Sequence, residues 1–194
     1  MMDSNAIRQL MRERRRSLSE QQQSKASIGL AQQLSNLPAF CHSKRIAFYL
    51  ANDGEIDPSI AMGIAEAAGK QCYLPVLHPL KQSRLYFAQY RNGDPLVVNR
   101  FGIKEPSLKT AQITPPLGID LILLPLVAFD RNGNRLGMGG GFYDRTLAQQ
   151  KKLTRLIGLA QSCQETDKIT HQPWDIALQA IVTDKTVIYP NKGH

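Results

Sequence analysis

The chain of 194 residues is 42% hydrophobic and 21% charged, which is ordinary for a globular protein long enough to bury a core. No apolar run approaches the roughly 18 residues of a membrane helix, and arginines occupy the N-terminal segment where a secretion signal would be apolar. A net charge of +8 favours an anionic partner, and three scattered cysteines argue against a disulfide framework or a zinc site.

Two helices are predicted at the N-terminus. Apolar residues at helical spacing, surrounded by arginines, predict a basic helix over about residues 4–18. Asp3 and Glu13 interrupt its basic face, which disfavours a mitochondrial transit peptide. Ser19, with Gln22 three residues later, has the pattern of a capping box at the start of a second helix. The apolar positions of that second helix are Ala26, Leu30, Leu34 and Leu37.

The segment from residue 45 to residue 118 alternates strand and helix signals. A helix is predicted to begin at Asp57–Pro58 and to stop at Gly69. Apolar runs bounded by turn residues predict buried strands at 45–50, 72–76 and 84–90. Turns or loops are expected at 92–95, in the ordered loop "FGIKEPS" (101–107) and in the proline-rich connector "ITPPLG" (113–118).

The remainder of the chain supplies the strongest strand signal. "DLILLPLVAF" (120–129) has the continuous apolar character of a strand buried on both faces. A glycine-rich segment follows, and then a helix from about Tyr143 to Lys151. Further strands are predicted at 155–160 and 177–184, with residues 186–190 as an additional candidate.

Buried strands alternating with helices predict an α/β fold. We expect a single three-layer domain over residues 1–194, with a largely parallel, Rossmann-like sheet sandwiched by helices. In such sheets ligands bind beyond the carboxyl ends of the strands. The strand, loop and helix over residues 121–144 therefore lie in the right place for a ligand site.

The loop in this segment is unusually bare. Glycines at positions 137, 139, 140 and 141 let successive backbone amides converge on phosphate oxygens, assisted by the positive end of the following helix. Arg135 is placed to grip phosphate, and Asp144 to cap the helix or hold a magnesium ion. Neither common nucleotide motif is present, since Phe142 replaces the last glycine of G-x-G-x-x-G. A tight structural turn is the alternative interpretation.

The segment from Phe129 to Asp144 resembles the signature of the 5-formyltetrahydrofolate cyclo-ligase family, F-D-x-x-G-x-R-L-G-x-G-x-G-[YF]-Y-D. The likeness extends to "RRRSLS" with Arg8, "YLANDGEID", "FGIKEP" and "IVTD". The resemblance implies a cytoplasmic enzyme of one-carbon metabolism. Such an enzyme uses ATP and Mg²⁺ to convert 5-formyltetrahydrofolate, with or without a polyglutamate tail, into 5,10-methenyltetrahydrofolate, with release of ADP and phosphate.

The resemblance also implies roles for individual residues. Arg135 and Asp144 would be catalytic, and the Mg²⁺ ligands would be Asp144 and Asp184. The ATP site would comprise Ser4, Arg8, Arg135, Leu136, Gly137, Met138, Gly139, Gly140, Gly141, Phe142 and Tyr143. The folate would contact Leu50, Glu55, Met138 and Phe142.

Most of these residues have an ordinary structural alternative, and the chain departs from the family at some of them. Asp184 and Glu55 would also suit turns, and Leu50 and Tyr143 would also suit a core. Many relatives carry Lys or Arg at the position of Ser4, and some carry basic residues within the glycine motif at the positions of Met138 and Gly140. The candidates to replace the missing charge are Arg12, Arg14 and Lys104.

Two competing functions fit parts of the sequence. A phosphosugar-handling enzyme would use a similar loop without ATP, but it does not require the full pattern from Arg135 to Asp144. An RNA-binding module would use the arginine helix, but the aromatic residues show no stacking pattern among basic ones. We therefore expect a small-molecule partner, no nucleic acid and no membrane. The sequence does not fix the oligomeric state, and a monomer or weak dimer is the expectation.

Overall fold

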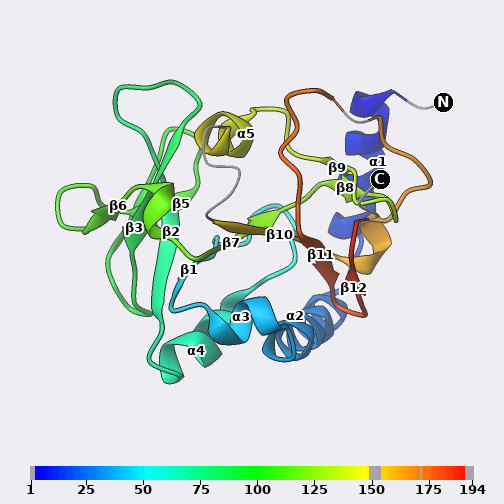
Figure 1. Ribbon diagram of the computed structural model, residues 1–194. Coiled ribbons are helices and arrows are strands. Elements are labelled where there is room, and N and C mark those ends of the chain that lie inside the picture. The colour runs from blue at the N-terminus through cyan, green and yellow to red at the C-terminus, as the bar shows by residue number, and fades with distance from the viewer. Residues whose placement is uncertain (1–2, 149–153, 171, 191–194) are drawn as a thin grey trace.

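A computed structural model of the chain describes residues 3–148, 154–170 and 172–190 (Figure 1). Its centre is an eight-stranded sheet in which five adjacent strands run parallel. In spatial order the strands are β12 (Val187–Ile188), β11 (Ala180–Thr183), β10 (Arg155–Ala160), β7 (Leu121–Pro125), β1 (Arg45–Ala47), β2 (Gln71–Leu77), β3 (Leu85–Gln89) and β6 (Ile113–Thr114). The strands β12, β3 and β6 pair antiparallel at the two edges.

Helices pack on one face of this sheet. They are α2 (Glu20–Ser35), α3 (Pro38–His42) and α4 (Ser59–Ala67), which lie below the sheet in Figure 1. Side chains of α2 and α4 share a buried cluster with alternate residues of the parallel strands, such as Leu121 and Leu123. The other residues of β7, Ile122 and Leu124, face the opposite cluster. Burial on both faces explains why this strand reads as a continuous apolar run.

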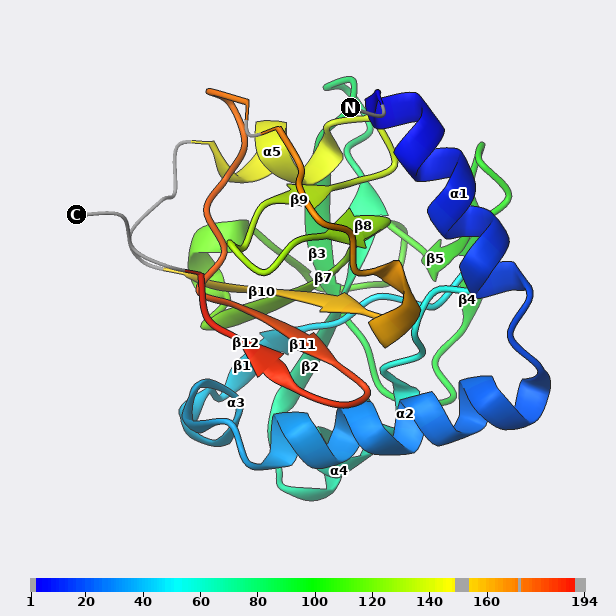
Figure 2. The ribbon, with the colours of Figure 1, turned by 90° about the vertical axis from the view of Figure 1, so that its right-hand side faces the viewer.

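On the opposite face, the α-helix among the described residues is α5 (Phe142–Leu147), which lies together with irregular segments. The first helix, α1 (Ser4–Arg16), lies across the carboxyl ends of the strands rather than on a face (Figure 2). Its residues Ile7 and Met11 pack against Val127, Ala128 and Leu136. Helices thus cover both faces as expected, which confirms the predicted α/β class. No helix in the described part of the chain is long and apolar enough to cross a membrane.

Two small hairpins complete the fold. One pairs β8 (Ala128–Phe129) with β9 (Arg135–Leu136), and the other pairs β4 (Leu96–Val98) with β5 (Lys104–Pro106). The predicted ordered loop 101–107 is therefore wrong in part, because its second half pairs as β5. Asn99 makes this pairing possible: its amide N–H donates to the Ile103 carbonyl, and its side-chain oxygen accepts from the Phe101 amide.

Several predicted boundaries are confirmed by local hydrogen bonds. Ser19 and Gln22 form the reciprocal capping box that starts α2. Gly69 follows α4 in the left-handed conformation, with φ of 73°, and its amide donates to the Glu66 carbonyl. Both features depend on neighbours within a few residues, so the sequence alone could predict them.

Other boundaries were wrong by a few residues. Helix α1 ends at Arg16, short of residue 18. Helix α4 begins at Ser59 rather than at Asp57–Pro58, because the Asp57 carboxylate accepts from both the amide and the hydroxyl of Ser59. Helix α5 begins at Phe142 and ends at Leu147, and residues 149–151 of the predicted helix lie outside the described part of the chain.

Two predicted segments divide into shorter elements. The run 120–129 splits into β7 and β8, since Pro125 has no N–H for the ladder and Val127 instead donates to the Leu136 carbonyl. The connector 113–118 contains the edge strand β6 and a single turn of 3₁₀ helix, Pro116–Gly118.

Candidate active site

The glycine motif is held at the carboxyl end of β7 by the hairpin β8–β9. The turn of this hairpin is organised by Asp130, which is completely buried and accepts from the amides of Asn132, Asn134 and Ile169. Gly133 completes the turn with φ of 85°, where a side chain would be strained. The first half of the signature is therefore scaffolding that fixes where Arg135 and the glycines lie.

The glycines themselves form an open loop against α1. Gly139 and Gly141 have φ of 95° and 62°, in the region that favours glycine. The Arg8 Nε donates to the Gly137 carbonyl at 2.9 Å, and a Cβ added at Gly139 would lie 3.8 Å from the Arg8 guanidinium. The structure therefore brings Arg8 to the glycine loop, where the sequence predicted an ATP contact.

Arg135 and Asp144 form an ion pair across the motif. Arg135 Nη2 lies 2.6 Å from Asp144 Oδ1, and Arg135 Nη1 donates to the Ile176 carbonyl at 2.7 Å. The Ile176 amide donates to the same Asp144 oxygen. The Arg135 side chain is only 8% exposed. Both residues lie at the motif, and their described contacts tie β9, α5 and the segment around Ile176 together.

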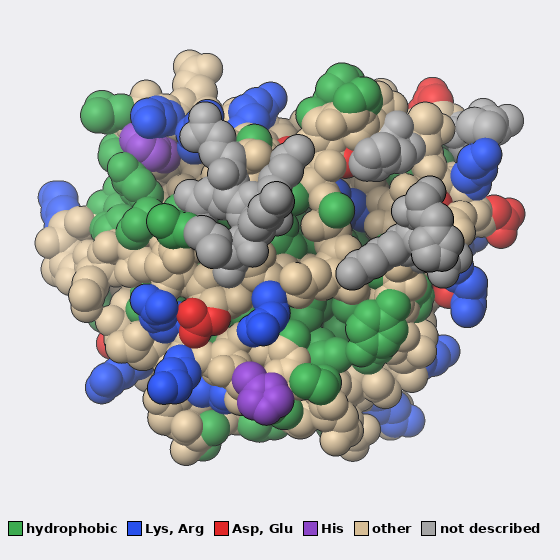
Figure 3. All heavy atoms as spheres, viewed as in Figure 1, with side chains coloured by type: hydrophobic (Ala, Val, Ile, Leu, Met, Phe, Trp, Pro, Cys, Tyr) green, Lys and Arg blue, Asp and Glu red, His purple; other side chains and the backbone are tan. Residues whose placement is uncertain are grey.

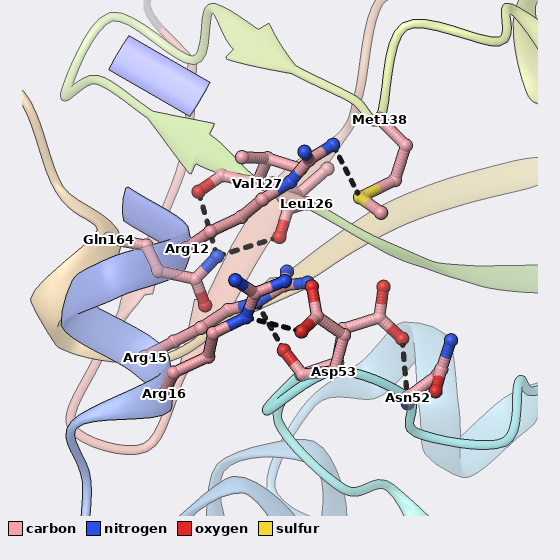
Figure 4. A network of polar contacts seen from close by, with 10 residues as sticks. Arg12, Arg15, Arg16, Asn52, Asp53, Leu126, Val127, Met138 and Gln164 are labelled. Atoms are coloured by element: carbon pink, nitrogen blue, oxygen red, sulfur yellow. Dashed lines mark hydrogen bonds and ion pairs between the residues drawn. The ribbon is translucent and has the colours of Figure 1, made fainter. Parts of the chain in front are cut away.

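A polar cavity of about 500 Å³ lies between α1 and the glycine loop, and we call it the α1–glycine groove. Its lining includes Arg8, Arg12, Glu13, Arg16, Met138 and Gly139. Figure 4 shows Arg12 reaching across to the thioether of Met138, at 3.7 Å from Nη2 to Sδ. Three guanidinium groups and one carboxylate give this groove the character of an anion site.

Glu55 lies in the loop after β1, with its Oε2 accepting from the Asn52 amide at 3.1 Å. Burial raises the pKa of Glu55 to about 7, and the Asn52 hydrogen bond and the nearby Arg15 charge oppose this rise. Burial also raises the pKa of Tyr143 above its ordinary value, and the negative charge of Glu55 adds to the effect. Glu55 and Tyr143 therefore lie within electrostatic range of each other, so the loop after β1 and the end of the glycine motif approach the same region.

The remaining predicted residues lie around this region with different partners. Leu50 is half-buried and packs against the cluster beneath the sheet. Asp184 follows β11 and accepts from the amide and hydroxyl of Ser162, at 2.6 Å and 3.2 Å. Its backbone carbonyl lies so close to α2 that a Cβ at Gly29 would approach it to 2.3 Å. Asp144 and Asp184 thus have separate partners, and no group of three His, Cys, Asp or Glu among the described residues could hold a metal ion.

Ser4 is the first residue of α1 but does not cap it. The cap is Asp3, whose Oδ1 accepts from the amides of Asn5 and Ala6, both at 2.8 Å. Phe142 lies beside the loop, with its ring in edge contact with Phe101 at a centroid distance of 5.8 Å. Met138 is 47% exposed and points toward Arg12 (Figure 4).

Sequence reasoning missed the contact between α1 and the loop after β1. Arg15 is fully buried, and its Nε and Nη2 donate to the carbonyl and the carboxylate of Asp53 at 2.7 Å and 2.9 Å. Asp53 and Gly54 have φ of 54° and 74°, so the loop turns tightly onto the helix (Figure 4). The signal was the "NDG" turn at 52–54, whose residue types favour this conformation, but nothing local identified an arginine partner.

The fold and the site together define a class: an α/β protein with a glycine-rich loop and an arginine-lined groove at the carboxyl ends of a mostly parallel sheet. The chain matches the profile of the 5-formyltetrahydrofolate cyclo-ligase family over residues 1–184. It is 41% identical to the 5-formyltetrahydrofolate cyclo-ligase of Escherichia coli K12 over 179 residues, which cover 92% of this chain and 98% of the relative. The corresponding protein of Haemophilus influenzae is also 41% identical, over 89% of this chain and 92% of its own length.

Comparison with solved structures supports the same family. The 5,10-methenyltetrahydrofolate synthetase of Aquifex aeolicus superimposes with a TM-score of 0.83 at 30% identity, covering 100% of this chain and 95% of its own. The synthetase of Mycoplasma pneumoniae gives 0.76 at 26% identity, covering 95% and 100%. The chain therefore belongs to the 5-formyltetrahydrofolate cyclo-ligase family, and it is an enzyme of the ligase type.

Proposed function

We propose that this protein closes the ring of 5-formyltetrahydrofolate to give 5,10-methenyltetrahydrofolate, with ATP as the second substrate. The observation that carries the proposal is the complete signature from Phe129 to Asp144, folded as an open loop beyond the carboxyl end of β7. Basic side chains of α1 line the groove beside this loop. A bare backbone flanked by arginines suits a polyphosphate, which is the ligand that such a reaction requires.

The proposed chemistry needs positioning more than a protein nucleophile. The formyl oxygen attacks the γ-phosphorus of ATP, and the bond to the β–γ bridging oxygen breaks to release ADP. The neighbouring folate nitrogen then attacks the activated formyl carbon and loses its proton, while the carbon–oxygen bond breaks to release phosphate. Because the second step is intramolecular, proximity supplies much of its rate. The protein has to hold two anionic substrates together and neutralise charge on the transferred group.

Roles for the residues follow from their places in the site. Arg8 and the amides of the glycine loop would bind the phosphates, and Arg135 would stabilise charge on the γ-phosphoryl group. Glu55 would accept from adjacent N–H donors of the pterin, for which a carboxylate pair of oxygens is well suited. Leu50, Phe142 and Met138 would provide apolar contacts around the ring.

Mg²⁺ would be served by Asp144 and Asp184, in part through water, and would neutralise the transferring phosphates when bound. The two carboxylates are suitable ligands for Mg²⁺, although each already has protein partners. Both described contacts of Asp144 fall on Oδ1, while Asp184 uses both of its oxygens on Ser162. Magnesium usually takes one or two protein carboxylates and completes its shell with water and phosphate, so two separated acids are compatible with it.

An RNA-binding function is less well supported. The guanidinium groups of α1 that lie nearest the glycine loop line a cavity rather than a flat surface. On the face shown in Figure 3, Lys and Arg side chains are scattered and mixed with acidic and other residues. A stripe of basic residues interleaved with exposed aromatic rings would be expected for single-stranded RNA.

The proposal is tested by a direct assay. Purified protein with ATP, magnesium and 5-formyltetrahydrofolate should produce the conjugated methenyl product, which appears as a new near-ultraviolet absorbance, together with one ADP for each product. Failure to form product from any formyl-folate would refute the assignment. A filter-binding titration against RNA at several salt concentrations is the matched test of the alternative, because nucleic-acid affinity falls steeply with salt.

A further inference from the structure

Arg12 is a guanidinium group held in the α1–glycine groove without an adequate acceptor. Its Nε is buried and has no hydrogen-bond partner among the described residues. Its Nη2 meets the Met138 thioether at 3.7 Å, and a thioether sulfur is a weak acceptor. A buried donor without a partner costs free energy, more so when it is charged. The arrangement is therefore incomplete in the protein alone.

The other arginines of α1 are engaged differently. Arg15 and Arg16 both bond to the carboxylate of Asp53 (Figure 4). Arg16 also lines the α1–glycine groove, but unlike Arg12 it has a charged acceptor. Arg14 is exposed, and its Nη1 reaches the Cys163 carbonyl at 3.5 Å. Arg12 follows Arg8 by four residues, so the two lie one turn apart on the same face of the helix.

We infer that Arg12 is the phosphate-binding cation that makes up for the uncharged Ser4. This inference rests on the proposed use of ATP and deepens it by assigning the missing charge. The oxygens of a nucleotide phosphate in the α1–glycine groove would accept from Arg12 Nε and Nη2, displacing the thioether contact. The planar guanidinium can offer two parallel N–H groups to one phosphate, which a single lysine cannot do.

The structure also favours Arg12 over Arg14 and Lys104, the two other candidates to replace the charge missing at Ser4. Arg14 does not line the groove and has its contact at Cys163. Lys104 belongs to β5 and is likewise absent from the groove lining. Arg12 alone of these three faces Met138 in the glycine motif.

The experiment compares Arg12→Gln with Arg14→Gln by isothermal titration calorimetry. ADP and inorganic tripolyphosphate serve as charged probes, and adenosine serves as the uncharged counterpart. We expect Arg12→Gln to weaken ADP and tripolyphosphate roughly 10- to 100-fold, as the loss of a charged hydrogen-bond pair predicts. Arg14→Gln should change the affinities for ADP and tripolyphosphate by less than about twofold, since an exposed charge outside the groove is screened by solvent and salt. Adenosine affinity should be the same in all three proteins.

Two further measurements separate the outcomes. Arg12→Lys should recover part of the affinity for tripolyphosphate, because it restores the charge without the two parallel N–H groups of a guanidinium. Thermal melting without ligand should show the Arg12→Gln variant folded, because the change removes an unsatisfied donor.

Equal weakening of adenosine and ADP, or unchanged ADP binding by Arg12→Gln, would overturn the inference. If the wild type forms the methenyl product while Arg12→Gln binds ADP normally, only the role of Arg12 fails. If the wild type binds ADP through Arg12 but forms no product, the reaction assignment fails and the role of Arg12 stands.

Discussion

Helix α1 presents arginines to two parts of the molecule, and it does so in opposite ways. Toward the loop after β1, Arg15 and Arg16 both meet the carboxylate of Asp53. Toward the glycine loop, Arg8 bonds to the Gly137 carbonyl and the Asn5 side chain, and the polar partner of Arg12 among the described residues is the Met138 sulfur. On the first side two guanidinium groups share one carboxylate, whereas on the second side the described hydrogen-bond acceptors of Arg8 and Arg12 carry no charge. The first contact joins the helix to the loop after β1, whereas the second leaves the charge available to the phosphate that we propose as its ligand.

The electrostatics of Asp53 agree with this division. The hydrogen bond from Arg16 is the main cause that holds the pKa of Asp53 below its ordinary value, and Arg15 adds to it. On the glycine side the described acceptors are a carbonyl, a side-chain amide and a thioether, none of which carries a charge. A phosphate entering there would interact with both guanidinium groups, opposed by the Glu13 carboxylate in the groove lining.

Arg135 tests whether a paired arginine must be structural, and its replacement gives the largest expected effect on activity. It is buried and paired with Asp144, as a structural arginine would be, yet it lies inside the signature. We expect Arg135→Ala to lower turnover at least about 100-fold, because donors aimed at developing charge are typically worth that much. Arg135→Lys should recover little, since it lacks the two-pronged contact.

Steady-state kinetics and thermal melting together decide the role of Arg135. Loss of turnover at substrate saturation, beyond any change in melting temperature, would support action on the phosphoryl group. Turnover near the wild-type value with a lowered melting temperature would instead support the structural-turn interpretation of the motif.

Arg15 and Arg16 test whether the contact with the loop after β1 stabilises the fold, because they share the Asp53 carboxylate but differ in burial. Arg15 is 0% exposed and Arg16 is 57% exposed. Replacing one partner of a buried ion pair costs about 3 kcal/mol, so Arg15→Met should lower the free energy of unfolding by that order. Arg16→Met should melt close to the wild type, because exposed pairs contribute little.

Urea unfolding of the two variants provides the measurement. Equal losses in both would show that burial does not distinguish these arginines, and the division of α1 into a structural and a ligand-binding side would lose its main support.

Glu55 gives a smaller effect that depends on pH. Burial raises its pKa from 4.5 to about 7 in the folded protein, whereas the unfolded chain keeps the ordinary value. Between these two values the folded state binds more protons than the unfolded state, so stability falls as the pH rises from about 4.5 to 7. Folate binding should follow the opposite trend, because the pterin donors need the ionised carboxylate.

The Glu55→Gln variant tests both trends. Its unfolding free energy should vary less with pH across this window than that of the wild type. The apparent KM for the folate, which should fall through pH 7 in the wild type, should become high and nearly flat. A wild-type KM that does not change through pH 7 would contradict the assignment of Glu55 to the substrate.

How far the sequence could predict the molecule depended on the range of the interactions. The capping box of Ser19 and Gln22 and the stop at Gly69 are set within a few residues. The continuous apolar run of β7 predicts burial on both faces of the strand, which the two core clusters confirm. By contrast, β5 consists of Lys, Glu and Pro, and only its pairing with β4 makes it a strand.

The site shows the same limit. The signature predicted that Arg135, the glycines and Asp144 belong together, since they are neighbours in the chain. It did not predict that Arg135 and Asp144 bond to each other and to Ile176, which lies more than thirty residues away from Asp144. It also could not rank Arg12 over Arg14, because two arginines two positions apart on one helix differ only in the surface that each one faces.

Asp144 and Asp184 provide the last and smallest prediction. They extend the comparison between charged side chains with and without a charged partner to the acids. Asp144 is neutralised by Arg135, whereas the described partners of Asp184 are the neutral amide and hydroxyl of Ser162. If both serve one magnesium ion, Asp144→Asn and Asp184→Asn should each raise the magnesium concentration for half-maximal activity about 10-fold, in the range seen when supporting groups of a metal site are altered. The double variant should then lose less than the sum of the two free energies, because the second change acts on a site already damaged. Magnesium titrations of the three variants, with folate affinity measured in parallel, decide the point. Fully additive losses, or a loss of folate affinity as large as the loss for magnesium, would assign the acids to separate structural roles, with Asp144 orienting Arg135 and Asp184 fixing the turn at Ser162.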